Sequence, residues 1–185
     1  MRYATIVRLL ASLLPWHGVA AETSVELLPG HSTVAFRAYG LGLLPLDGQF
    51  AHFHGRFTYD PDAPTHCSVT LQAEVASLAI TPATFGEMVL GPDFLDAAQF
   101  PALAYHGACS ADGLTGVLSM HGVTRPFSLT LDWEKSAVTA VGQLLRADWG
   151  MTARPLLGGS TARIAVAVPL PAPAVVRGVV PTTDR

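Results

Sequence analysis

Charged residues are scarce in this chain, and those present show no excess of positive charge. Only 14% of its 185 residues are Asp, Glu, Lys or Arg, and the formal net charge is −3. Such a chain lacks the basic surface that neutralises nucleic-acid phosphates, so nucleic acid is not an expected partner. Apolar residues make up 50% of the sequence, which is enough for the core of one domain.

The chain also lacks the short motifs that mark common catalytic and cofactor sites. It contains no G-x-S-x-G nucleophile motif, no H-E-x-x-H metal pair and no paired-cysteine metal motif. Gly40 and Gly42 resemble the start of a dinucleotide-binding loop, but Pro45 stands where the third glycine should be and no helical pattern follows. We therefore predict a protein that is not an enzyme and uses no cofactor.

Two histidines are the best candidates for metal ligands in the sequence. His52 and His54 lie two residues apart, so in an extended strand they share one face and could both contact a metal ion. No third ligand is evident, and we favour a solvated face over a metal site. His31, His106 and His121 stand alone and are interpreted as surface or hydrogen-bonding histidines.

Long apolar runs are absent apart from a short one near the N-terminus. Residues 1–21 combine the positive charges of Arg2 and Arg8, an apolar run to Leu14 and small residues up to Ala21. This pattern predicts a secretory signal peptide cleaved near Ala21, and therefore export. A membrane anchor is the alternative, which we disfavour because the run is too short to span a bilayer and Arg8 interrupts it.

One domain, residues 22–170, is expected to follow the signal peptide. Within it, apolar and polar residues alternate with a period of two, which predicts β-strands with one buried face. About eight such strands occur at the spacing typical of an antiparallel sandwich or barrel. The tail, residues 171–185, is rich in Pro and Val without any period, and we expect it to be disordered.

Two segments interrupt the simple alternation. Phe50 breaks the parity of the strand predicted over residues 49–60, which indicates a bulge near Ala51 or His52. Residues 81–98 are the only helical candidate, with Gly91 marking the end of the helix. We expect this short helix to form a lid or plug at one end of a barrel. A late strand is predicted over residues 138–149.

The inward faces predicted by the alternation mix large apolar side chains with small residues. The small ones are Ala38, Gly55, Ala73, Gly107, Ala140 and Gly142. An eight-stranded barrel holds either its own side chains or one slim ligand, and small inward residues favour the second interpretation. The residues predicted to contact the ligand are Phe36, Phe57, Leu71, Ala73, Tyr105, Met120, Leu129 and Val166. The alternative is a barrel that fills itself.

Arg146 is a further candidate for ligand contact. It shares parity with Leu144, so its side chain is predicted to point inward, with Asp148 close enough to pair. A buried guanidinium needs acceptors, which either a ligand head group or Asp148 could supply. We slightly favour the ion pair with Asp148, closing one end of the barrel.

The two cysteines predict a disulfide. If the strand that begins at Cys67 pairs antiparallel with the strand that ends at Cys109, setting these residues opposite one another places Leu71 opposite Tyr105 and Ala73 opposite Leu103. All of these residues are inward by the alternation of their own strands, so the register is self-consistent. Export favours the oxidised pair, and two buried free thiols are the alternative.

Several short motifs resemble one protein family. The stretch GVLSMHGVTRP, residues 116–126, is similar to the signature hairpin of the YceI-like family, periplasmic polyisoprenoid-binding proteins with a lipocalin-like barrel. Further similar pieces follow in the family's order: His31-Ser32 with Val34 and Phe36, Asp93–Asp96 with Phe100-Pro101, and Arg146 with Asp148–Met151. The resemblance implies an antiparallel eight-stranded lipocalin-like barrel, a periplasmic location and a polyisoprenoid or isoprenoid-quinone chain in the pore.

Three functions remain open from the sequence. The first is an exported monomer or homodimer that carries or sequesters a long isoprenoid lipid. The second is an accessory partner of a membrane electron-transfer protein, with transient contact to the membrane or to that protein. The third is a lipid-modifying enzyme, which we disfavour because the sequence contains none of the catalytic motifs considered above.

Overall fold

A computed structural model describes residues 22–40, 43–154 and 159–171 of the chain. The predicted signal peptide, residues 1–21, lies outside the described residues, as does all but the first residue of the predicted tail. Both therefore stay predictions. In the ranges described, no helix has the length and apolar character needed to cross a membrane.

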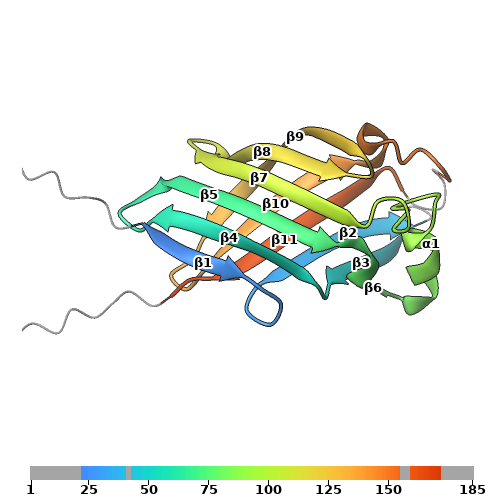
Figure 1. Cartoon of the computed structure of the whole chain (residues 1–185), viewed down its shortest axis with the longest axis horizontal. Helices are drawn as coiled ribbons and strands as arrows, with labels where there is room; N and C mark the ends of the chain where they lie inside the picture. The colour runs from blue at the N-terminus through green and yellow to red at the C-terminus, as the bar shows by residue number, and fades with distance from the viewer. Residues whose placement is uncertain (1–21, 41–42, 155–158, 172–185) are drawn as a thin grey trace, which may run out of the picture.

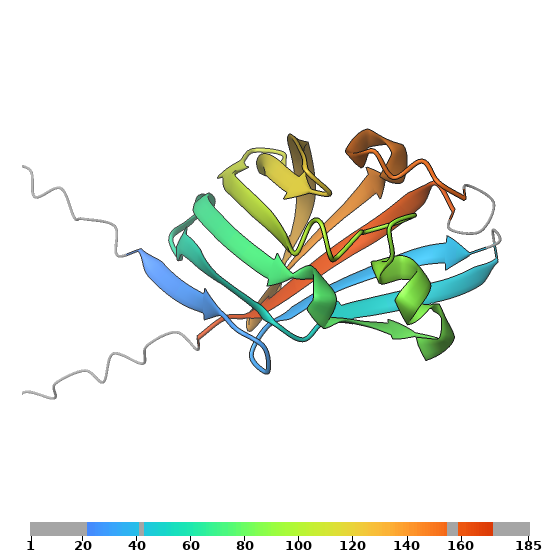
Figure 2. The same cartoon turned by 45° about the vertical axis from the view of Figure 1, so that its right-hand side comes forward.

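The described chain forms one antiparallel sheet of eleven strands, in the order β1-β4-β5-β7-β8-β9-β10-β11-β2-β3-β6. Their bounds are β1 Thr23–Leu27, β2 Thr33–Gly40, β3 Leu44–Phe50, β4 Phe53–Asp60, β5 Ala63–Glu74, β6 Leu78–Thr81, β7 Ala102–Ser110, β8 Gly113–Met120, β9 Val123–Trp133, β10 Ala137–Leu145 and β11 Thr161–Pro169. The sheet curls, so that β5, β7 and β8 cross in front of β10 and β11 in Figure 1, and Figure 2 shows the enclosed interior.

The prediction of eight strands is not confirmed, and the reason lies in two interrupted strands. β3 and β4 follow one another with only residues 51–52 between them, at the predicted bulge, and β5 continues into β6 through a single 3-10 turn, η1 (Val75–Ser77). β3 pairs with β6 and β4 pairs with β5, so the two interrupted strands run side by side. These two divisions and the additional strand β1 account for the difference from the predicted number.

The alternation in the sequence predicts a turn over residues 122–126 between β8 and β9, but the observed turn is shorter. Its loop consists of His121 and Gly122, with φ values of 51° and 72°. Two consecutive residues with positive φ are typical of the two-residue turns whose twist matches that of the flanking strands. The residues after Gly122, expected in the turn, belong to β9, where Pro126 lies opposite Val117. The predicted turn was therefore too long.

The predicted register between β5 and β7 is confirmed. Leu71 lies opposite Tyr105 and Ala73 opposite Leu103, and Cys67 is bonded to Cys109 with 4.9 Å between their Cα atoms. The cysteine pairing selected this register, and the alternation of apolar residues supported it, because a slip by one residue would place inward side chains against outward ones.

Helical structure is confined to short segments and is shorter than predicted. Within residues 81–98, a 3-10 turn, η2 (Ala83–Phe85), leads into α1 (Gly86–Leu90), which ends before Gly91 as expected. Thr81, at the start of the predicted segment, belongs to β6, and Pro82 is the N-cap residue of η2, without a side-chain cap hydrogen bond. α1 lies at one end of the curled sheet, beside β3 and β6 (Figure 1).

The predicted strand over residues 138–149 is wrong at its end. β10 ends at Leu145, and Arg146–Trp149 form a 3-10 turn, η3, closed by Gly150 in the left-handed conformation. This turn brings the chain across the same end of the sheet that α1 covers (Figure 2). We call α1, residues 91–101 and η3 together the end cap.

Removal of the disulfide is expected to lower the free energy of unfolding by about 3–4 kcal/mol, because the bond closes a loop of 42 residues in the unfolded chain. Denaturant unfolding of the oxidised protein, with and without reductant, measures the difference. The double variant Cys67→Ala/Cys109→Ala is the control, and its stability should not respond to reductant. Two thiols titrating in the unreduced protein would contradict the bond.

Tyr105 generates a prediction about alkaline stability. Its buried hydroxyl donates a hydrogen bond of 3.1 Å to the carbonyl oxygen of Phe127, and burial raises the pKa of Tyr105 to about 12. The unfolded state, with its pKa near 10, loses this proton first, so the stability present below pH 10 should decline between about pH 10 and 12. Tyr105→Phe should remove that decline and cost about 1 kcal/mol at neutral pH.

The matched control for this measurement is Tyr39→Phe, because the Tyr39 side chain is exposed. Its unfolding free energy, followed by denaturation from neutral pH to pH 12, should retain the wild-type decline. An unchanged decline in Tyr105→Phe would contradict the assignment.

Candidate functional site

The interior of the curled sheet contains three apolar cavities, with volumes of about 90, 60 and 30 Å³. The largest lies under the end cap, where Val89 of α1, Phe94 and Leu95 form part of its wall. The smallest lies between Leu27 and Val168. Since their walls are almost wholly apolar, an apolar ligand fits them better than water does.

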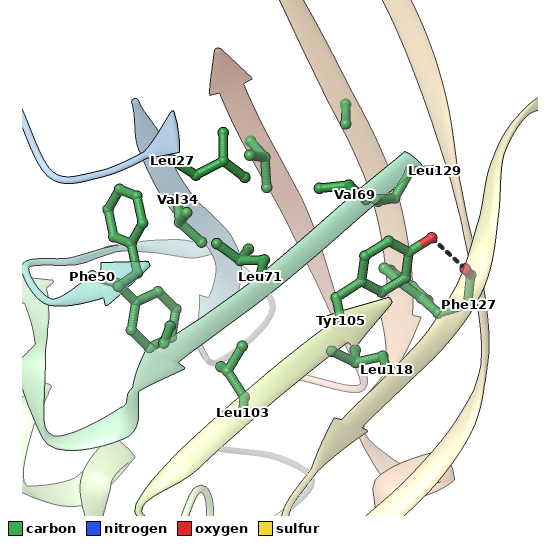
Figure 3. Packing of buried hydrophobic residues seen from close by; sticks show 14 of the residues in the cluster. Leu27, Val34, Phe50, Val69, Leu71, Leu103, Tyr105, Leu118, Phe127 and Leu129 are labelled. Carbon is green, nitrogen blue, oxygen red and sulfur yellow. Dashed lines mark hydrogen bonds between the residues drawn. The ribbon is translucent and has the colours of Figure 1, made fainter. Parts of the chain in front are cut away.

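The three cavities form a row, because neighbouring cavities share wall residues. The first and second share Phe50, Leu103, Met120, Leu144 and Ile164, and the second and third share Leu71, Tyr105, Leu129 and Val166. Figure 3 shows part of this wall, with side chains from opposite sides of the curled sheet converging on the interior. Side chains, not backbone strands, therefore separate one cavity from the next.

The structure brings all but one of the predicted ligand-contacting residues to this row. The residues that line at least one cavity are Phe36, Phe57, Leu71, Tyr105, Met120, Leu129, Arg146 and Val166. Ala73 is inward and only 1% exposed, but it borders a separate hollow with His52, His54 and Glu74 instead. Whether the eight residues contact a ligand stays a prediction.

Neighbouring side chains fill the space beside two of the small inward residues. A Cβ atom at Gly107 would lie 2.8 Å from the Tyr105 hydroxyl oxygen, and one at Gly142 would lie 2.7 Å from a methyl carbon of Leu129. These glycines therefore make room for large neighbours. Ala38 and Ala140, by contrast, do border cavities. Sequence parity identified the inward face but not how neighbouring side chains fill the space beside its glycines.

Arg146 is buried at the capped end of the row, with 6% exposure, and lines the largest cavity. Its Nη1 and Nη2 groups donate to the carbonyl oxygens of Gly159 and Ala153, at 2.7 and 2.9 Å. The guanidinium carbon lies 4.4 Å from the centre of the Phe94 ring, a cation–π contact. Burial lowers the pKa of Arg146.

The predicted ion pair between Arg146 and Asp148 is wrong. The Asp148 carboxylate lies 3.6 Å from Nη1 of Arg125, which also donates to the Asp148 carbonyl oxygen at 2.8 Å. The physical reason is the turn η3: a 3-10 conformation replaces the strand in which Arg146 and Asp148 would have shared a face. The inward position of Arg146 is nevertheless observed.

Three of the motifs found in the sequence meet at the end cap. His121 of the β8–β9 turn donates through Nδ1 to the carbonyl oxygen of Trp149 at 2.9 Å, and the indole of Trp149 donates to Leu118 at 3.3 Å. The ring of Phe100 packs on His121, with 4.5 Å between ring centres. The motifs therefore hold three separate segments together over the largest cavity.

Sequence reasoning missed the residues that the end cap, and Met151 just after η3, contribute to the wall. Val89, Phe94, Leu95 and Met151 line the largest cavity, but none belongs to an alternating strand. Only the family resemblance pointed to two of them, because Phe94 and Met151 fall within motifs that resemble the family. The alternation of apolar and polar residues did not predict that their side chains point inward.

His52, one of the two histidines considered as metal ligands, contacts a carboxylate in the structure. His52 lies with its Nδ1 atom 3.1 Å from a carboxylate oxygen of Glu74, and both side chains are exposed. In the part of the chain that the structure describes, no group of three or more His, Cys, Asp or Glu side chains could hold a metal ion.

Comparison with known proteins places this geometry in a family. A family model described as a YceI-like domain matches residues 26–172. A UPF0312 protein of Pseudomonas putida is 32% identical over 133 residues, covering 67% of this chain and 69% of the relative, and one of Vibrio campbellii is 25% identical over 130 residues, with the same coverage.

Solved structures share the fold at low identity. Burkholderia cenocepacia BcnA superposes with a TM-score of 0.63 at 19% identity, covering 76% of this chain and 96% of BcnA. A polyisoprenoid-binding domain from Saccharophagus degradans, implicated in plant cell wall breakdown, gives a TM-score of 0.58 at 12% identity, covering 81% of this chain and 98% of that domain. The family-model match and the Pseudomonas relative together show that the chain belongs to the YceI-like family.

Proposed function

We propose that this protein binds a long apolar isoprenoid chain, a polyisoprenoid or an isoprenoid quinone, along the row of internal cavities. The observation that carries the proposal is the row itself, which is apolar along its length and bordered by residues from most strands of the sheet. The structural neighbour from Saccharophagus degradans, a polyisoprenoid-binding domain, supports the same ligand class. In this proposal the protein binds and carries or sequesters the lipid, and catalyses no reaction.

The proposed binding unit is a lipocalin-like barrel. If β3 with β4 and β5 with β6 each act as one interrupted strand, every strand of the ring has a partner on both sides, and β1 is an addition alongside β4. A ring of this kind encloses an interior only wide enough for one slim ligand.

Ligand entry in this proposal enlarges the row by side-chain rotation. The three volumes fall well below the range of about 300–1,000 Å³ typical of ligand pockets. The walls between them are formed partly by Met120, Leu71 and Leu129, and methionine in particular adopts many shapes at little cost. Rotation of these side chains would join the cavities into one channel without any change in the strands.

The expected affinity favours a long chain over a short one. One five-carbon isoprene unit contributes about 3–4 kcal/mol of apolar burial, and association costs about 4–15 kcal/mol. Several units are therefore needed before the binding free energy reaches about −8 kcal/mol, which corresponds to a micromolar dissociation constant.

Three large apolar side chains are exposed at the capped end and support a transient contact with a membrane. Tyr39, Leu43 and Leu145 are 49%, 88% and 51% exposed. Leu145 lies opposite Thr161 of β11, and β2, which carries Tyr39, is the next strand of the sheet. We call these three residues the apolar rim, and propose that lipid enters there after export to the periplasm.

An accessory role beside a membrane electron-transfer protein is the second candidate. The same apolar rim would contact that partner, and a quinone would be the ligand. The two candidates share the cavity row and differ in the partner, so quinone exchange with purified membranes, compared with exchange to pure lipid vesicles, separates them.

Filling the largest cavity should abolish lipid binding. Ala38 is buried and lines this cavity, so Ala38→Phe is expected to place a ring in it and lower the affinity for a long isoprenoid by at least about tenfold, at a stability cost of about 1–3 kcal/mol. Binding is measured by mass spectrometry of lipid retained after gel filtration. Ala79→Phe, at an exposed position of β6, is the matched control and should bind like wild type.

Equal retention by Ala38→Phe and wild type would place the binding site elsewhere. Failure of the wild-type protein to retain any long isoprenoid, either from cells or after incubation, would contradict the proposed function itself.

Acidic substitutions in the apolar rim should slow lipid uptake from vesicles without changing the affinity. Leu43→Asp/Leu145→Asp removes two leucines, each worth about 1.5–3 kcal/mol when buried, so uptake from vesicles should slow by about tenfold or more. Affinity for detergent-dispersed lipid should stay the same. Val117→Asp, exposed on β8, is the control. Equal slowing by the control would show a general effect of charge.

A further inference from the structure

Arg146 is the one charged residue among the described residues that line the cavity row, and its charge has no carboxylate partner there. A buried charge is costly unless it is paired or fully hydrogen-bonded, so an arginine in this position requires an explanation. The nearest acidic candidate in the sequence, Asp148, pairs with Arg125 instead.

The hydrogen bonds of Arg146 account for part of its donor capacity. A guanidinium carries five N–H donors. Its two Nη groups reach the carbonyl oxygens of Gly159 and Ala153, but the buried Nε has no partner. The bonds to Gly159 and Ala153 explain how Arg146 connects two segments of the chain. They do not explain the free Nε–H or the position in the cavity wall.

We propose that Arg146 binds an acceptor oxygen on the head group of the isoprenoid, and so fixes which end of the ligand lies under the end cap. This inference rests on the proposed function. The shared chemistry is an oxygen acceptor at the end of an apolar chain, either a phosphate oxygen or a quinone carbonyl. Charge-assisted hydrogen bonds from arginine suit both, and suit phosphate better because it also neutralises the guanidinium.

The other two cavities offer no comparable donor. Their lining residues are apolar except for Tyr105, whose hydroxyl already donates to the carbonyl oxygen of Phe127, as Figure 3 shows. A polar head group placed there would lose its hydrogen bonds to water without replacement. The ligand therefore lies with its head at Arg146 and its tail toward Leu27 and Val168. The apolar rim lies at the head end.

The test compares three ligands with the same long isoprenoid tail: a hydrocarbon, a monophosphate and a quinone. Wild type should bind the monophosphate and the quinone about ten- to a hundredfold more tightly than the hydrocarbon. Arg146→Met should remove this preference while affinity for the hydrocarbon stays within a few fold. Arg146→Lys should restore part of the preference for the monophosphate only. Arg56→Met, an exposed arginine of β4 paired with Glu26, is the matched control and should retain the full preference.

The outcomes distinguish this inference from the proposed function. If wild type binds all three ligands equally, or if Arg146→Met lowers all three affinities in parallel, Arg146 has a structural role only and the inference is wrong, while the proposed function stands. If wild type binds none of the three, the proposed function fails. The wild-type comparison decides the question even if Arg146→Met does not fold. A preference for the monophosphate alone would identify an anionic head group, a preference for the quinone alone would identify a neutral carbonyl, and an equal preference for both would show that Arg146 accepts either acceptor oxygen.

Discussion

The inward face of the sheet can be buried only if the sheet curls onto itself. The described residues contain one α-helix, of five residues, which is far too small to cover eleven strands. Apolar side chains on opposite strands must therefore supply each other's contacts across the interior, and every strand must keep its register for this to work. The disulfide between Cys67 and Cys109 fixes the register of β5 and β7 near one end of that pair.

Curling of a long sheet also explains the two interrupted strands. A strand that passes from one side of a curled sheet to the other must bend, and bulges and short turns provide the bend. Residues 51–52 interrupt one strand and η1 interrupts its partner at a matching point, where Ala51 donates to the carbonyl oxygen of Ser77. The paired interruptions let β3 and β6 continue toward the end cap while β4 and β5 remain over the other half of the interior.

In the end cap, short sequence motifs stabilise turns and loops rather than strands. His121, Trp149 and Phe100 come from three distant segments, and their contacts hold the β8–β9 turn, η3 and the loop after α1 together. This assembly also forms the wall around Arg146. Family motifs and a candidate ligand site thus coincide at one end of the molecule, where the apolar rim is also exposed.

The sequence by itself determined the inward face of most strands, because a period of two leaves only one choice of face, and setting Cys67 opposite Cys109 selected a register that agrees with those faces. It also indicated the break near Ala51 and the end of the helix at Gly91. Only the tertiary structure decided that Arg146 bonds to carbonyl oxygens rather than to Asp148, and that Tyr105 and Leu129 fill the space at Gly107 and Gly142. Those outcomes depend on a 3-10 turn and on the way large side chains of the same strand (Tyr105) or the neighbouring strand (Leu129) pack over the glycines, and the alternation of apolar and polar residues does not reveal either.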